Sequence, residues 1–234
     1  MKRTGKYLIL GLIFLGFVAS GSANPFVGGD GSESNPYEIN SCSQFQKIET
    51  GDYSVQSAPE PNEYKFGRLA GHYELISDID CSNIQDFEPI GNNSFAFDFP
   101  NHYYDTAPFY GSFDGNNHSI NNLFVNASID KPVTEANVWG DGVFEGLSAE
   151  MNGESSGVKN VRFRNLTLIT DQRASLFGKT PENGKPNVRN VLVDSDSLIE
   201  ARTDFAGILY DGGSVKNSIF RGSLKVDNVF NSNV

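Results

Sequence analysis

A short pattern recurs with a nearly constant period along the second half of the sequence. Apolar triplets stand at 142–144, 175–177 and 207–209, and a matching strand is predicted around Phe109. Counted from Phe109, the steps to Phe144, Phe177 and Leu209 are 35, 33 and 32 residues. Such a period is typical of stacked-repeat architectures, because one repeat cannot bury its apolar face alone.

Each repeat also contains a short segment with an asparagine at its third position. These segments are 120–123 (INNL), 158–161 (VKNV), 188–191 (VRNV) and 215–218 (VKNS). Strand alternation predicts one shared inward position, occupied by Ile120, Val158, Val188 and Val215. We expect the four asparagines to form a single row at a bend, because Asn tolerates the left-handed backbone conformation and can hydrogen-bond along a stack. They are Asn122, Asn160, Asn190 and Asn217.

The fold that this pattern predicts is all-β, a right-handed parallel β-helix (solenoid) over residues 73–234. The handedness follows the general preference of parallel crossovers. Residues 24–72 are predicted to form an N-terminal cap region with a short helix near 43–50 and an exposed loop over 51–72. Phe45 and Ile48 fall on one face of that helix at helical spacing. Further strands are expected at 37–39, 73–80 and 87–91.

Residues 1–23 have the pattern of a cleaved signal peptide. A basic start is followed by an apolar stretch and by the small residues of 21–23. An uncleaved membrane anchor is the alternative, although the apolar stretch is short for a span of about 20 residues. Either way we expect an extracytoplasmic protein, secreted or attached to the cell surface, without a further membrane span.

The charge of the chain and its few cysteines limit which partners and cofactors it can bind. Without residues 1–23 the chain has 15 Lys and Arg against 29 Asp and Glu, a net charge of −14. Such an acidic surface disfavours nucleic acid as a partner. Cys42 and Cys81 are the only cysteines, and in an exported protein a disulfide is expected, with free thiols as the alternative. Two cysteines and three scattered histidines offer too few ligands for a metal site, so no cofactor is expected.

The repeats resemble the GLUG-motif repeats of microbial surface proteins. Residues 142–146 (GVFEG) and 175–178 (SLFG) are similar to the motif, and 207–210 (GILY) departs from it at the fourth place. The segments 73–81 (YELISDIDC) and 87–91 (FEPIG) are similar to the lead-in of such proteins. The resemblance implies a β-helix fold and a non-catalytic, adhesin-like or structural role at the cell surface.

An enzymatic alternative stays open, because many β-helix proteins cleave polysaccharides. Asp78 and Asp80 lie two residues apart and face one side of a strand, as do Asp86 and Glu88. Such a pair could supply acid and base at a glycosidic bond in a secreted glycosidase or lyase. No His-Glu-x-x-His motif of a metallopeptidase is present.

Two groups of residues are candidates for modification or binding. Four glycosylation sequons begin at Asn92, Asn117, Asn126 and Asn165. The spacing between repeats varies at 126–141, 165–174 and 195–205, and these segments, with 92–107, are predicted to be loops at one phase of the repeat. Insertions at one phase project from one side, often the binding side. Tyr103, Tyr104 and Trp139 are therefore predicted to form a patch that contacts a glycan or a surface protein.

Overall fold

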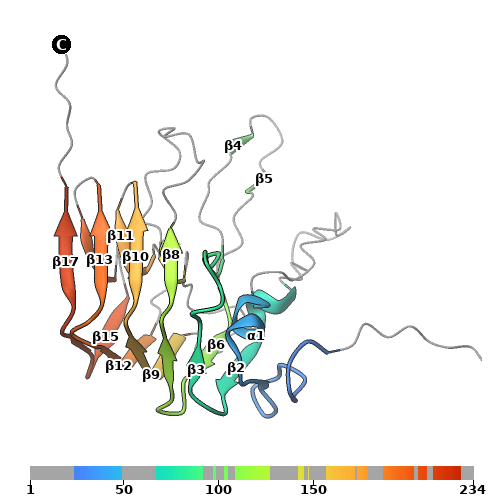
Figure 1. Cartoon of the computed structure of the whole chain (residues 1–234). Helices are drawn as coiled ribbons and strands as arrows, with labels where there is room; N and C mark the ends of the chain where they lie inside the picture. The colour runs from blue at the N-terminus through green and yellow to red at the C-terminus, as the bar shows by residue number, and fades with distance from the viewer. Residues whose placement is uncertain are drawn as a thin grey trace, which may run out of the picture.

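The computed structural model describes residues 24–48, 67–91, 97–98, 103–104, 109–126, 142–144, 147, 157–171, 173–178, 187–202, 205–209 and 213–227. This part of the chain is almost entirely β structure, and its sheets are parallel except for one short pair. Figure 1 shows the strands side by side in sequence order, from the N-terminal helix to β17 at the opposite end. The predicted all-β class is confirmed.

The largest sheet is built from strands that recur once in each repeat. Its strands, in spatial order, are β1 (Tyr37–Ile39), β2 (His72–Leu75), β6 (Ser112–Asp114), β9 (Gly157–Arg164), β12 (Asn187–Val193) and β15 (Ser214–Lys216). Three shorter strands continue the same sheet past the bends that follow β2, β6 and β15. They are β3 (Ile79–Asp80), β7 (Ser119–Asn121) and β16 (Ile219–Phe220). Because β1 already belongs to this sheet, parallel pairing begins inside the region 24–72.

Two smaller parallel sheets complete each repeat. The second sheet contains β8 (Phe124–Asn126), β10 (Thr167–Thr170), β13 (Leu198–Ala201) and β17 (Ser223–Val226). The third sheet pairs β11 (Ala174–Phe177) with β14 (Ala206–Leu209), and single bridges continue it through Phe144 to Ile90. The chain visits the three sheets in turn before it returns to the first. A separate antiparallel pair joins β4 (Phe97–Asp98) to β5 (Tyr103–Tyr104).

The N-terminal end carries a short helix, α1 (Cys42–Gln46), and a 3₁₀ turn, η1 (Gly67–Ala70). The helix is shorter than predicted, and Ser41 precedes it without a side-chain capping bond. Phe45 and Ile48 are fully buried, as their helical spacing predicted. The Phe45 ring stacks on Phe87 with centroids 5.0 Å apart, so the helix contributes an aromatic side chain to the core at this end.

Inside the sheets, apolar side chains are aligned in columns that run across the strands. One column contains Phe113, Val158, Val188 and Val215, and another contains Ile79, Ile120, Phe163, Val193 and Phe220. Apart from Val215 and Phe220 on the outermost strands, all of these side chains are buried. Each buried side chain of this size contributes roughly 1.5–3 kcal/mol of transfer free energy, so stacking of the repeats is the main source of stability.

The register corrects the predicted alignment in the repeat that contains Phe109. Ile120 aligns with Phe163 and not with Val158, whose partner is Phe113. Phe109 bridges Leu147, whereas Phe144 bridges Ile90 and Phe177. The reason is that this repeat contains one asparagine bend after β6 and another after β7, and the predicted alignment matched its second bend, at Asn122, to the first bend of the next repeat, at Asn160.

Three predicted elements also differ from the structure. The strand expected at 73–80 is divided into β2 and β3 by a bend. Segment 87–91 forms no strand, and only Ile90 makes a bridge. In the loop expected at 51–72, η1 and the start of β2 occupy 67–72 with Leu69 buried, while 51–66 lies outside the described residues.

The predicted disulfide is confirmed, since Cys42 and Cys81 are bonded with Cα atoms 5.1 Å apart. It joins α1 to the residue that follows β3 and closes a separation of 39 residues. The chain-entropy argument gives about 4 kcal/mol for a loop of this size.

We expect Cys42→Ser to lower the free energy of unfolding by about 2–4 kcal/mol in urea titrations. Dithiothreitol should reproduce this loss in the unsubstituted protein and add nothing in Cys42→Ser; no change in either protein would contradict the assignment.

Candidate binding surface

The outward face of the largest sheet carries a continuous row of charged residues, one on each strand. The register aligns Glu38, Glu74, Asp114, Lys159, Arg189 and Lys216, which we call the charged column. Its acidic half lies on the N-terminal strands and its basic half on the C-terminal strands. The two halves meet at an ion pair between Lys159 and Asp114, with nitrogen and oxygen 3.0 Å apart.

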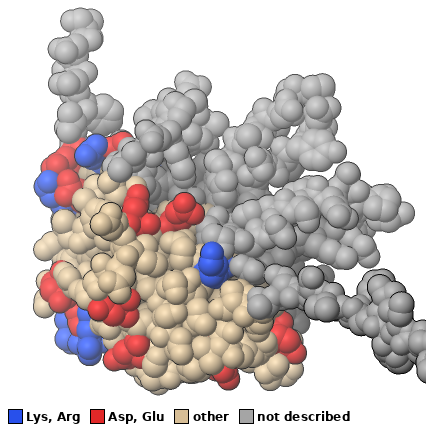
Figure 2. Space-filling model, turned by 45° about the vertical axis from the view of Figure 1, so that its right-hand side comes forward, with Lys and Arg blue, Asp and Glu red and all other residues tan. Residues whose placement is uncertain are grey.

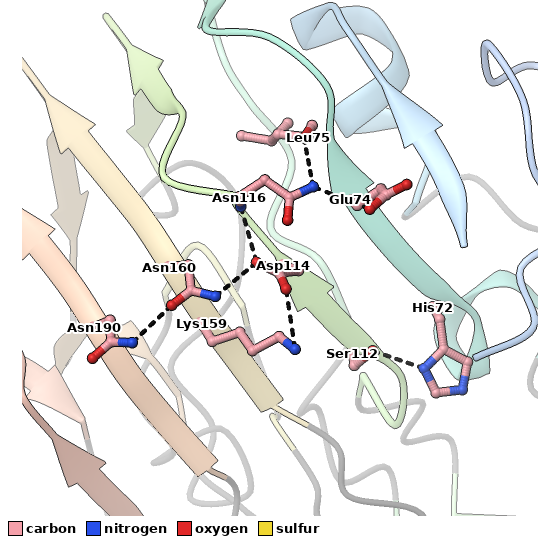
Figure 3. A network of polar contacts seen from close by, with 9 residues as sticks. All are labelled: His72, Glu74, Leu75, Ser112, Asp114, Asn116, Lys159, Asn160 and Asn190. Carbon is pink, nitrogen blue, oxygen red and sulfur yellow. Dashed lines mark hydrogen bonds and ion pairs between the residues drawn. The ribbon is translucent and has the colours of Figure 1, made fainter. Parts of the chain in front are cut away.

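Asp114 is the centre of a polar network that joins four strands and the turn after β6 (Figure 3). Its carboxylate accepts hydrogen bonds from the Asn116 backbone N–H at 2.9 Å and from the Asn160 side chain at 3.0 Å. Asn190 in turn donates to Asn160 at 2.7 Å. The side chains therefore form a ladder across β6, β9 and β12.

A second ladder stands at the next bend and joins Asp80, Asn122 and Asn165. Asn122 donates to Asp80 at 2.8 Å, and Asn165 donates to Asn122 at 2.7 Å. Asn122 thus stacks on Asn165. The prediction of a single row, which placed Asn122 beside Asn160, is wrong. The register does place Asn217 beside Asn190 in the first ladder.

The left-handed backbone conformation predicted for Asn122, Asn160, Asn190 and Asn217 is confirmed, and Asn165 shares it. The φ angles are 56° at Asn122, 54° at Asn160, 49° at Asn165, 54° at Asn190 and 50° at Asn217. Asn122 and Asn165 lie where the chain passes from the first sheet to the second, whereas Asn160 and Asn190 lie within β9 and β12. Asparagine combines this backbone conformation with a side chain that can both donate and accept along the ladder.

The ionisation of Asp114 follows from these contacts. Burial raises the pKa of its carboxyl, but the Asn116 N–H, the Asn160 amide and the Lys159 ammonium outweigh burial, so the pKa lies below its usual value. The Asn122 amide likewise lowers the pKa of Asp80. These carboxylates remain ionised at neutral pH and act as hydrogen-bond acceptors at the bends.

In the two carboxylate pairs singled out from the sequence, the three aspartates accept hydrogen bonds in the same way, whereas Glu88 takes part through its backbone. Asp78 accepts from the Ser119 N–H at 2.8 Å, which lowers its pKa. Asp86 accepts from the Asn126 N–H at 3.1 Å, and the backbone N–H of Glu88 donates to Gln46. A glycosidase acid needs a raised pKa, whereas hydrogen bonds lower the pKa of both Asp78 and Asp80.

The predicted aromatic patch stays a prediction, because one of its three residues lies outside the described part of the chain. Tyr103 and Tyr104 form β5, and Trp139 lies outside the described residues. Segments 165–174 and 195–205, predicted as loops, contain β10 and β13. Segment 127–141 follows β8 of the second sheet, whereas 92–108 follows Ile90 of the third sheet. The two insertions therefore do not share one phase of the repeat.

The sequon asparagines differ in their surroundings. Asn117 is exposed at a turn, and only its backbone is hydrogen-bonded, donating to the Asn160 carbonyl. Asn165 is exposed, but its amide is part of the second ladder. Asn126 is half-buried, and Asn92 lies outside the described residues. Of the described sequons, Asn117 is the one whose amide could carry a glycan without loss of a ladder bond.

The charged column was not predicted from the sequence, although a signal was present. A basic residue precedes the ladder asparagine in three repeats, at Lys159, Arg189 and Lys216. Within the described part of the chain, no cluster of three or more His, Cys, Asp or Glu could hold a metal ion. Among those same residues, no helix is long and apolar enough to cross a membrane.

Comparisons with known proteins do not assign a family. No family model matches the sequence, and no curated protein matches it. One crystal structure is similar, described as a "putative immunoglobulin A1 protease" from Bacteroides ovatus, with 17% identity and a TM-score of 0.49. The match covers 88% of this chain and 66% of that chain, which is just under two thirds of its length. At this level the protease description belongs to that protein alone.

The first ladder gives a direct test of the asparagine bends. Asn160→Ala removes two side-chain hydrogen bonds and forces alanine into a left-handed conformation, so we expect a loss of about 2–3 kcal/mol in urea titrations. Asn117→Ala is the matched control, because Asn117 has a φ of 65° but no side-chain bond to any described residue. Equal losses in both variants would show that the ladder bonds contribute nothing.

Asp114 generates a prediction for pH. Because its pKa is depressed in the folded state, its contribution to stability is present above the unfolded pKa of about 3.9 and is lost as pH falls through the folded value. We expect Asp114→Asn to be less stable than the unsubstituted protein at pH 7 but to lose less stability between about pH 5 and pH 3. Chemical denaturation across this range measures both, with the exposed Glu33→Gln as control. Parallel stability–pH curves would contradict the prediction.

Proposed function

We propose that the protein is a non-catalytic, exported surface protein of the adhesin-like or structural kind, built as a right-handed parallel β-helix. The regular return of the chain to the same three parallel sheets supports the architecture. The observation that carries the non-catalytic role is the use of Asp78, Asp80 and Asp114 as hydrogen-bonded bend acceptors with lowered pKa values. None of them resembles a general acid.

Export is supported by the Cys42–Cys81 disulfide, since disulfides persist mainly in oxidising compartments outside the cytoplasm. The signal-peptide pattern of residues 1–23 points the same way. The GLUG resemblance adds a preference for the cell surface. A partner glycan or surface protein would bind through the insertions between the sheets, where Tyr103, Tyr104 and Trp139 lie.

The alternative is a secreted carbohydrate-active enzyme that uses the Asp78 and Asp80 pair. Two assays with the purified protein distinguish the surface protein from the enzyme. The first measures retention of the protein on immobilised cells, and the second measures release of new reducing or unsaturated ends from soluble polysaccharides. We expect retention without product. Product formation that Asp80→Asn abolishes, in a variant that remains folded, would establish the enzyme instead.

The insertions can be tested separately because they follow different sheets. We expect Trp139→Ala to weaken retention on cells or glycans by at least about fivefold, since one aromatic stacking contact contributes roughly 1 kcal/mol. Tyr103→Ala with Tyr104→Ala serves as the second arm. Melting temperatures within about 2 °C of the unsubstituted protein would show that folding is unaffected. Full retention in both arms would contradict binding through these aromatics.

A further inference from the structure

The strands β15, β16 and β17 form the C-terminal edge of the described sheets, and no described strand lies beyond them. Their apolar side chains lose the burial that the same columns have elsewhere. Val215 is 41% exposed although Val188 beside it is fully buried, and Leu224 is 51% exposed although Ile199 beside it is fully buried. Ile219 and Val226 are also exposed. An unpaired edge with apolar columns accepts an additional strand readily.

At this edge, the last residue of two outward columns is positively charged. The charged column finishes with Arg189 and then Lys216, which are neighbours of like charge on adjacent strands. A second outward column contains Asp194 and finishes with Arg221. Among the described residues, neither Lys216 nor Arg221 makes an ion pair. Like charges opposite each other destabilise a sheet, so carboxylates on the next strand would relieve this repulsion.

Two ion pairs between neighbouring strands show how such charges are neutralised elsewhere in the sheets. Lys159 pairs with Asp114 on the strand before it at 3.0 Å. Lys225 on β17 pairs with Glu200 on β13 at 3.1 Å, and that contact raises the Lys225 pKa together with the larger effect of Asp227. Carboxylates on one strand therefore face ammonium groups on the next.

The charge of the whole chain is divided in the same direction. Residues 24–126 hold 15 acidic and three basic residues, whereas residues 127–234 hold 14 acidic and 12 basic residues. Figure 2 shows Lys and Arg gathered mainly toward the end of the molecule nearest the C-terminus, among some Asp and Glu. The second half is therefore nearly neutral at −2, against −12 for the first half, so an acidic ligand is repelled much less at this end than at the other.

We propose that the edge formed by β15, β16 and β17 binds an extended acidic segment of a partner polypeptide as an additional parallel strand. Apolar side chains of that segment cover Val215 and Phe220, and its carboxylates lie opposite Lys216 and Arg221. This assignment depends on the strand register alone and is independent of the proposed function.

The register supplies a rational probe. In residues 72–80 (HYELISDID), Tyr73 and Glu74 occupy the columns that end in Val215 and Lys216. Asp80 occupies the column that ends in Arg221. A synthetic peptide of this sequence therefore presents carboxylates and apolar groups from the same columns, with six residues from Glu74 to Asp80 against five from Lys216 to Arg221. The control peptide HYKLISKIK has the same apolar residues with lysines in place of the carboxylates.

The experiment is fluorescence anisotropy of the labelled peptide with the full chain. We expect saturable binding that weakens as salt rises, and at least tenfold weaker binding to Lys216→Glu/Arg221→Glu. Lys47→Glu at the other end of the molecule is the control for added negative charge and should bind as the unsubstituted protein does. If Lys216→Glu/Arg221→Glu proves unfolded by circular dichroism, the milder Lys216→Gln/Arg221→Gln replaces it.

Three results would overturn the proposal. The first is no binding of HYELISDID at any salt concentration. The second is equal binding of HYKLISKIK, or affinity unchanged by neutralising or reversing Lys216 and Arg221. The third is sedimentation of the protein alone as a dimer that the peptide does not disrupt, which would assign the edge to a second copy.

Discussion

The parallel register between successive repeats is the constraint on which the rest of this structure depends. Each strand must place its apolar side chains over those of the strand before it, because a shift of one residue would turn them to the outward face. The same register aligns whatever lies on the outward face, so charges and amides are also brought into columns. The packed core and the charged column are therefore two consequences of one arrangement.

The bends between sheets depend on asparagine for a related reason. A left-handed residue costs little for asparagine, and its amide then meets the equivalent amide or carboxylate of the next repeat. Aspartates such as Asp80 and Asp114 begin the ladders by accepting without donating. Hydrogen bonds to these carboxylates keep them ionised, and this makes them poor proton donors and good structural acceptors.

The alignment of Phe144 with Phe177 and Leu209, the all-β class and the disulfide could be predicted from the sequence because each depends on local composition or on a count. The register of the repeat that contains Phe109 could not, because left-handed asparagines occur at two bends in this repeat and in the next, and the sequence pattern does not distinguish the first bend from the second. Ile120 was therefore matched to Val158, one bend too early. The error moved Asn122 into the wrong row and placed loops where β10 and β13 form strands. The charged column depended on the correct register and could not be predicted without it.

The most direct test of this account is the pairing partner of Asn121, measured by disulfide trapping and peptide mapping. Adjacent strands lie about 4.8 Å apart, within the Cα separation that a disulfide spans. The structure pairs Asn121 with Arg164, so Asn121→Cys/Arg164→Cys should form an intramolecular bond under mild oxidation, with Cys42–Cys81 intact. The repeat alignment read from the sequence alone pairs Asn121 with Lys159. Efficient bonding in Asn121→Cys/Lys159→Cys, with none in the first variant, would contradict the register and the ladders built on it.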